Sequence, residues 1–86
     1  MNNMNYLNEM NNMRNILDKL KLKADSISKE LYKKRCCLAR ITSKEVYDNS
    51  VTDYFILEGR YKGLKDAIAM IESMITDSEK IITNYA

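Results

Sequence analysis

Apolar residues recur every seven residues through the first half of the chain, at two positions of each repeat. The first position, a, holds Asn3, Met10, Leu17, Ala24, Leu31 and Leu38, and the second, d, holds Tyr6, Met13, Leu20, Ile27, Lys34 and Ile41. Only Asn3 and Lys34 depart from the pattern. A heptad repeat sustained in this way is typical of a coiled coil. It predicts a helix over about residues 4–41.

A second heptad frame runs through the other half of the chain. Its a positions are Tyr54, Tyr61, Ile68, Ile75 and Ile82, and its d positions are Leu57, Leu64, Ile71, Ser78 and Tyr85. It predicts a helix over about residues 51–84. The segment Asp48-Asn49-Ser50 between the frames contains turn and helix-cap residues, and Ser50 with Asp53 resembles a capping box. The sequence therefore predicts a connector over about residues 42–50.

The two frames fit together if the chain folds back between Tyr47 and Asp48. In an antiparallel coiled coil, a positions of one helix layer with d positions of the other. The layers are then Met10 with Tyr85, Met13 with Ile82, Leu17 with Ser78, Leu20 with Ile75, Ala24 with Ile71, Ile27 with Ile68, Leu31 with Leu64, Lys34 with Tyr61, Leu38 with Leu57, and Ile41 with Tyr54. We expect Lys34 to lay its aliphatic stem along the Tyr61 ring. With no proline and only two glycines to interrupt a helix, the prediction is an all-α single domain over residues 1–86, an antiparallel two-helix coiled-coil hairpin.

The second predicted helix carries another apolar stripe, at its c and g positions and on its glycines. The members of this stripe are apolar or small: Ile56, Gly59, Gly63, Ala67, Met70, Met74 and Ile81. The c positions of the first helix are polar by comparison, so we expect the second helix to be central. A stripe of this kind implies a partner. Two partners fit: a second copy of the chain, giving a homodimeric four-helix bundle, or a foreign protein bound through adaptable methionines.

Charge is distributed unevenly between the two halves of the chain. Residues 1–44 carry ten basic and four acidic side chains, whereas residues 45–86 carry four basic and eight acidic ones. The simplest interpretation is that the first helix is attracted to the second and that the remaining charges are solvated. The alternative is a nucleic-acid-binding surface, for which no known motif is present. Its phosphate-contacting candidates are Lys19, Lys23, Lys29, Lys33 and Arg40.

Sequence signatures of catalysis and metal binding do not occur. The chain has no histidine and no phosphate loop, Cys-X-X-Cys or nucleophile elbow, so we expect no enzyme activity, no cofactor and no metal. Cys36 and Cys37 are adjacent, which suits reduced thiols in a cytoplasmic protein better than a disulfide framework. The N-terminal residues lack a basic segment followed by an apolar core, and no apolar run approaches a membrane span. We therefore expect no signal peptide and no membrane partner.

The segment Tyr54-Phe-Ile-Leu-Glu-Gly-Arg-Tyr-Lys-Gly-Leu-Lys-Asp-Ala-Ile-Ala-Met-Ile-Glu resembles the second helix of small helical proteins encoded by phages and mobile elements. The resemblance covers less than a third of the chain and carries no functional residue over. It implies a protein that binds and inhibits a host protein in the bacterial cytoplasm, as anti-CRISPR and other anti-defence proteins do. Bacteriocin immunity proteins and small phage structural subunits are similar in size and class. A purely structural homo-oligomeric coiled-coil subunit and a nucleic-acid-binding helical protein stay open as alternatives.

Overall fold

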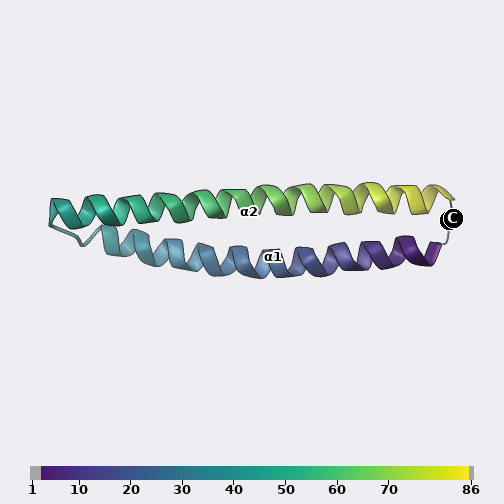
Figure 1. Ribbon diagram of the computed structural model, residues 1–86, viewed down its shortest axis with the longest axis horizontal. Helices are drawn as coiled ribbons and strands as arrows, with labels where there is room; N and C mark the ends of the chain where they lie inside the picture. The colour runs from purple at the N-terminus through teal and green to yellow at the C-terminus, as the bar shows by residue number, and fades with distance from the viewer. Residues whose placement is uncertain (1–2, 86) are drawn as a thin grey trace.

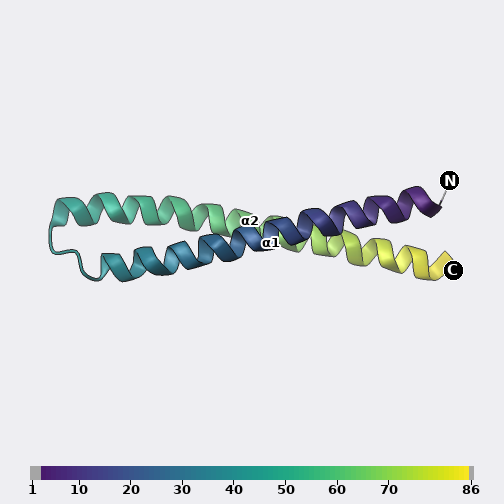
Figure 2. The ribbon, with the colours of Figure 1, turned by 90° about the horizontal axis from the view of Figure 1, so that it is seen from below.

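The protein is a hairpin of two long antiparallel helices. In this computed structural model, α1 spans Asn3–Leu38 and α2 spans Lys44–Tyr85, and the two lie side by side along a rod of 63 × 15 × 15 Å (Figure 1). The structure describes the backbone of residues 3–85 and the side chains of residue 5 and residues 7–81. Seen from the perpendicular direction, the helices cross near the middle of the rod, and the start of α1 lies at the same end as the end of α2 (Figure 2). The predicted helical hairpin is confirmed.

Both heptad frames are confirmed by burial. Every described side chain that is buried occupies an a or d position: Met10, Leu17, Ala24, Ile27, Leu31, Tyr54, Leu57, Ile68 and Ile75. Each helix thus turns one apolar stripe toward the other, as a heptad repeat requires. The seam is thin, because within the described part of the chain no side chain is fully buried.

The connector lies earlier in the chain than the sequence predicted. α1 ends at Leu38, not near residue 41, and α2 begins at Lys44, not near residue 51. The last turn of α1 tightens, with the amide of Ile41 donating to the carbonyl of Leu38 at 3.3 Å, a common way to satisfy the carbonyls at a helix end. The first turn of α2 closes as the Tyr47 amide donates to the Ser43 carbonyl at 2.9 Å. The predicted bend at Tyr47–Asp48 is therefore wrong.

The segment Asp48-Asn49-Ser50 lies inside α2 because its residue types only weakly oppose a helix. Aspartate, asparagine and serine each cost less than about 0.7 kcal/mol in a helix interior, and the hydroxyl of Thr52 donates back to the Asp48 carbonyl at 3.0 Å within this turn. Ser43 directly precedes α2 and is a favoured residue type for that position. As a result, the start of α2 extends beyond the end of α1 (Figure 1).

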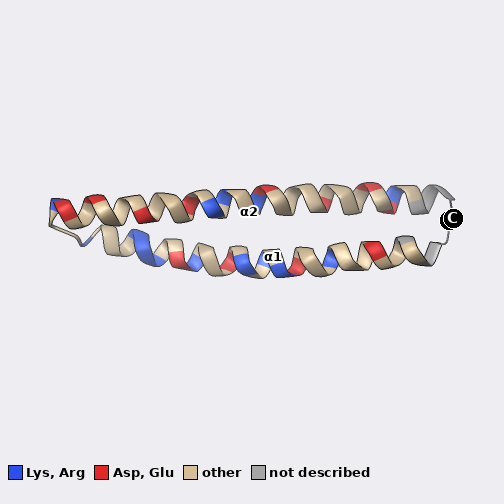
Figure 3. Cartoon of the chain, viewed as in Figure 1, with Lys and Arg blue, Asp and Glu red and all other residues tan. Residues whose placement is uncertain are grey.

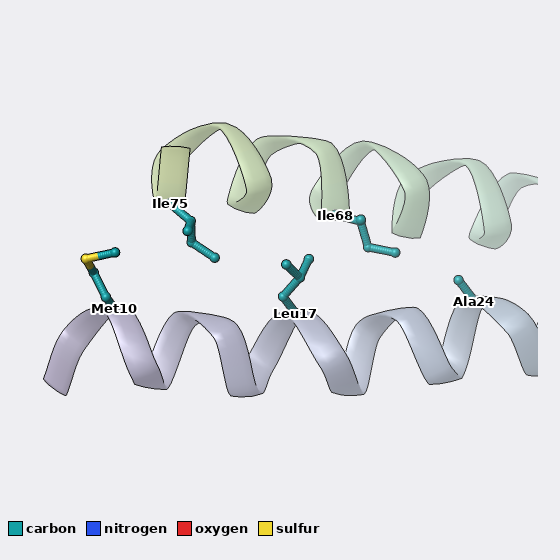
Figure 4. Close-up of a cluster of buried hydrophobic side chains, with 5 residues drawn as sticks. All are labelled: Met10, Leu17, Ala24, Ile68 and Ile75. Carbon is teal, nitrogen blue, oxygen red and sulfur yellow. The ribbon is translucent and has the colours of Figure 1, made fainter. Parts of the chain in front are cut away.

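The register of the seam differs from the predicted one by about one heptad at the end far from the connector. Leu17 lies between Ile68 and Ile75 in the close-up of the buried cluster (Figure 4), and Ile71 packs against the same cluster. The prediction placed Leu17 farther along α2, opposite Ser78. The predicted layers of Met10 with Tyr85 and Met13 with Ile82 involve side chains of α2 that lie outside the described residues.

The same displacement is present near the connector. Tyr54 and Leu57 form a buried cluster with Ile27 and Leu31, whereas the prediction placed Tyr54 opposite Ile41. Tyr61 packs against both buried clusters, whereas the prediction placed it opposite Lys34. The predicted order of layers along the seam is therefore wrong, although the buried side chains of both helices occupy predicted a and d positions.

Ion pairs along one flank of the seam favour the observed register. At the e positions, Arg14 pairs with Glu79, and Lys21 lies 3.8 Å from Glu72, Nζ to Oε1. In the predicted register these positions would instead bring Lys21 beside Glu79 and Arg35 beside Lys65. Moving one helix by seven residues preserves every a and d position, so the apolar seam does not distinguish the two registers. The flanking charges do, as they set partner orientation in coiled coils generally.

Arg35 continues this flank toward the connector. Its Nη2 and Nε donate to the hydroxyl of Tyr54 at 2.7 and 3.2 Å, and its guanidinium carbon lies 5.8 Å from the centre of the Tyr54 ring. The hydrogen bond to Tyr54, with help from the nearby Glu58 carboxylate, raises the pKa of Arg35 above its ordinary value. Arg35 on Tyr54 is therefore a contact between a basic residue and a seam tyrosine that the sequence did not predict.

We expect Tyr54→Phe to lower the urea midpoint of unfolding slightly. The substitution keeps the buried ring but removes the hydroxyl that accepts both hydrogen bonds from Arg35, and a hydrogen bond to a charged group contributes more than a neutral one. The matched control is Tyr32→Phe, whose side chain is 68% exposed. Equal midpoints for the two variants, measured by circular dichroism, would show that the Arg35 contact contributes nothing.

Candidate interaction surface

The second apolar stripe of α2 lies on the surface of the hairpin. Ile56 is 54% exposed, Met70 66%, Met74 50% and Ile81 50%. Gly59 and Gly63 are also exposed, and Ala67 is half-buried. Helical geometry at 3.6 residues per turn places these seven residues on one face of α2. We call this face the α2 stripe; it runs next to the d positions of the seam.

The two glycines of the stripe are not needed by the hairpin itself. A Cβ atom added at Gly59 or at Gly63 would meet no heavy atom within 4 Å. A glycine inside a helix costs about 1 kcal/mol relative to alanine. No contact within the described chain requires a glycine at either position. The open space beside each glycine lies on the outer surface of α2 and not in the seam.

Further exposed apolar side chains lie outside the predicted set. On α2 these are Val46, Tyr47 and Phe55, and on α1 they are Leu7, Ile16, Leu22 and Tyr32. The sequence reasoning missed Val46 and Tyr47 because it assigned them to a connector. Those of α1 occupy four different heptad positions (e, g, f and b), so they form no stripe. Of these four residues, only Ile16 is at a g position. In an antiparallel pair of helices, the g positions of both helices lie on the same flank of the seam.

The basic residues predicted to contact phosphate are all exposed. Lys19, Lys23, Lys29 and Lys33 lie on α1, and Arg40 lies in the connector. Figure 3 shows acidic residues interspersed with basic ones along α1. No feature of the described structure supports nucleic-acid binding by α1, which stays a prediction.

The described part of the chain includes both cysteines. No group of three or more His, Cys, Asp or Glu residues there is arranged to hold a metal ion. Cys36 and Cys37 are both exposed free thiols. Neither helix, over the residues described, is apolar enough along a sufficient length to cross a bilayer.

Comparisons with known proteins found no match to this chain. No family model matches the sequence, and no curated protein or solved structure matches the chain.

Proposed function

We propose that this chain is a non-catalytic protein-interaction module that binds a partner protein through the α2 stripe. The observation that carries the proposal is the exposure of Ile56, Met70, Met74 and Ile81 along one face of α2 while the seam occupies another face. Apolar surface removed from water contributes about 25 cal/mol per Å². A contiguous apolar stripe beside a satisfied seam is therefore a surface that gains from a partner.

The chemistry of the stripe suits a helical or gently curved protein surface. Its two methionines are flexible and polarisable and adapt to irregular contacts, and its glycines admit close approach of a partner's side chains or backbone. The resemblance to phage-encoded helical proteins extends the proposal to the partner's identity. In that case the partner is a protein of the bacterial host. The hairpin would inhibit this host protein by covering part of the host protein's surface.

Affinity capture from a bacterial lysate to which free chain has been added tests the proposal with three immobilised forms of the chain. These are the unmodified chain, Met74→Glu in the stripe and Leu22→Glu on α1, whose side chain is 70% exposed and lies off the stripe. We expect at least one protein, a second copy of this chain included, to be retained by the unmodified chain and by Leu22→Glu and to be lost with Met74→Glu. The same set of proteins on all three forms would refute the proposal, since binding would not depend on the stripe.

A further inference from the structure

The α2 stripe is complementary to itself when two copies of α2 lie antiparallel. Its g and c positions alternate by three and four residues, as a and d do in an ordinary seam, so an antiparallel pair layers g of one copy with c of the other. One register places Gly63 opposite Met74 of the second copy, Ala67 opposite its Met70, and Ile56 opposite its Ile81. Gly63 and Ala67 each then face a methionine, and pairing small with large residues is how well-packed interfaces fill space.

The same register also matches charge. It places Arg60, at a g position, opposite Asp77 of the second copy, at a c position, and the two-fold symmetry repeats the contact. Both side chains are exposed in the hairpin, and within the described chain neither takes part in an ion pair or a side-chain hydrogen bond. A polar layer of this type fixes register and orientation in coiled coils.

Other arrangements of two stripes fit less well. Sliding one copy by a heptad in one direction brings Gly63 opposite Ala67 and leaves a void. Sliding it in the other direction brings Met70 opposite Met74. It also brings Asp77 opposite Ala67, so that Asp77 has no basic partner. A parallel pair would place Arg60 against Arg60 and Asp77 against Asp77, and like charges brought together in this way oppose association.

We propose that the α2 stripe binds the α2 stripe of a second copy of this chain, antiparallel, about a two-fold axis that passes level with residues 68 and 69. This inference rests on the proposed function and names its partner. The thin seam supports it, because the described hairpin buries no side chain fully and small two-helix units gain stability by oligomerising. Closed two-fold dimers are the commonest assemblies of soluble proteins. In the dimer, the two α2 helices are central and the two α1 helices are peripheral.

Charge exchange at Arg60 and Asp77 tests both the partner and the register. Arg60→Asp places two aspartates in each polar layer, and Asp77→Arg places two arginines there. We expect each single variant to raise the dissociation constant of the dimer by about tenfold or more, as measured by sedimentation equilibrium. The double variant Arg60→Asp/Asp77→Arg restores opposite charges in both layers, so we expect its dissociation constant within a few-fold of the unmodified chain.

The matched controls make the same charge changes on the outer side of α1. Lys29→Asp and Asp25→Arg alter net charge as the test variants do, at exposed positions outside the stripe. We expect no change in dissociation constant for either. Circular dichroism of every variant checks that helix content is retained, which is expected because all four positions are exposed.

Two outcomes overturn the inference. A chain that stays monomeric at all concentrations removes the second copy as partner, and a dimer in which the double variant is no tighter than the single ones removes the register. If stripe-dependent capture of a foreign protein persists with a monomeric chain, the proposed function stands and only the partner is wrong. If the chain is monomeric and capture is also independent of Met74, both proposals fail.

Discussion

Replacing Ile68 by alanine is expected to lower the free energy of unfolding by about 2–5 kcal/mol. Ile68 is 5% exposed and belongs to the buried cluster that also contains Leu17, Ala24 and Ile75 (Figure 4). Truncating it removes apolar contacts and leaves a cavity between two long helices, which have few other contacts through which to compensate. A loss of this size is a large part of the stability of a small domain.

The measurement is urea denaturation followed by circular dichroism at one fixed protein concentration. Fixing the concentration matters because dimerisation contributes to apparent stability by mass action. The control is Leu22→Ala, which removes a similar volume from a side chain that is 70% exposed and should change stability by no more than about 0.5 kcal/mol. Similar losses for the two variants would contradict the assignment of the seam as the core.

The seam could be predicted from the sequence because its information is local. Spacing within one helix decides which residues share a face. The heptad spacing therefore predicts correctly the members of the buried cluster: Met10, Leu17 and Ala24 in α1, and Ile68 and Ile75 in α2. The stripe containing Met70 and Met74 was found by the same reasoning and is exposed as predicted.

The register could not be obtained from those spacings, since it depends on how two helices are placed relative to one another. A slip of one heptad keeps the apolar seam intact and changes only what lies beside it. The pairing of Lys21 with Glu72 and the contact of Arg35 with Tyr54 distinguish the two registers. The uneven charge of the two halves predicts attraction between the helices but not which residues pair, so the pairing of Lys21 with Glu72 was not predicted.

The connector was misplaced because residue types that favour turns were given more weight than the continuation of the heptad frame. Tyr47 and Ser50 occupy the a and d positions that precede Tyr54, so the second frame already extends toward residue 44. Asparagine and aspartate on an exposed helix face cost little. A better prediction would have followed the frame backwards until the serine at residue 43, a favoured helix cap, interrupted it.

The largest expected effect on association comes from Gly63. Gly63→Trp should raise the dissociation constant of the proposed dimer by about a hundredfold or more, because an indole would occupy the space that Met74 of the second copy fills and overpacked interfaces are strongly disfavoured. The hairpin itself should tolerate the change. A Cβ at this position meets nothing within 4 Å, and tryptophan is a better helix former than glycine.

Two further variants separate packing from other causes. Ala69→Trp introduces the same indole at an exposed position of α2 off the stripe, and should leave both helix content and dimerisation unchanged. Gly63→Met with Met74→Gly exchanges the large and small partners of one layer, so it should recover much of the affinity that Gly63→Met alone loses. Sedimentation equilibrium measures each dissociation constant. If Gly63→Trp dimerises as tightly as the unmodified chain, the glycine does not face a second copy and the stripe packs elsewhere; if the exchange recovers nothing, Gly63 and Met74 do not share a layer.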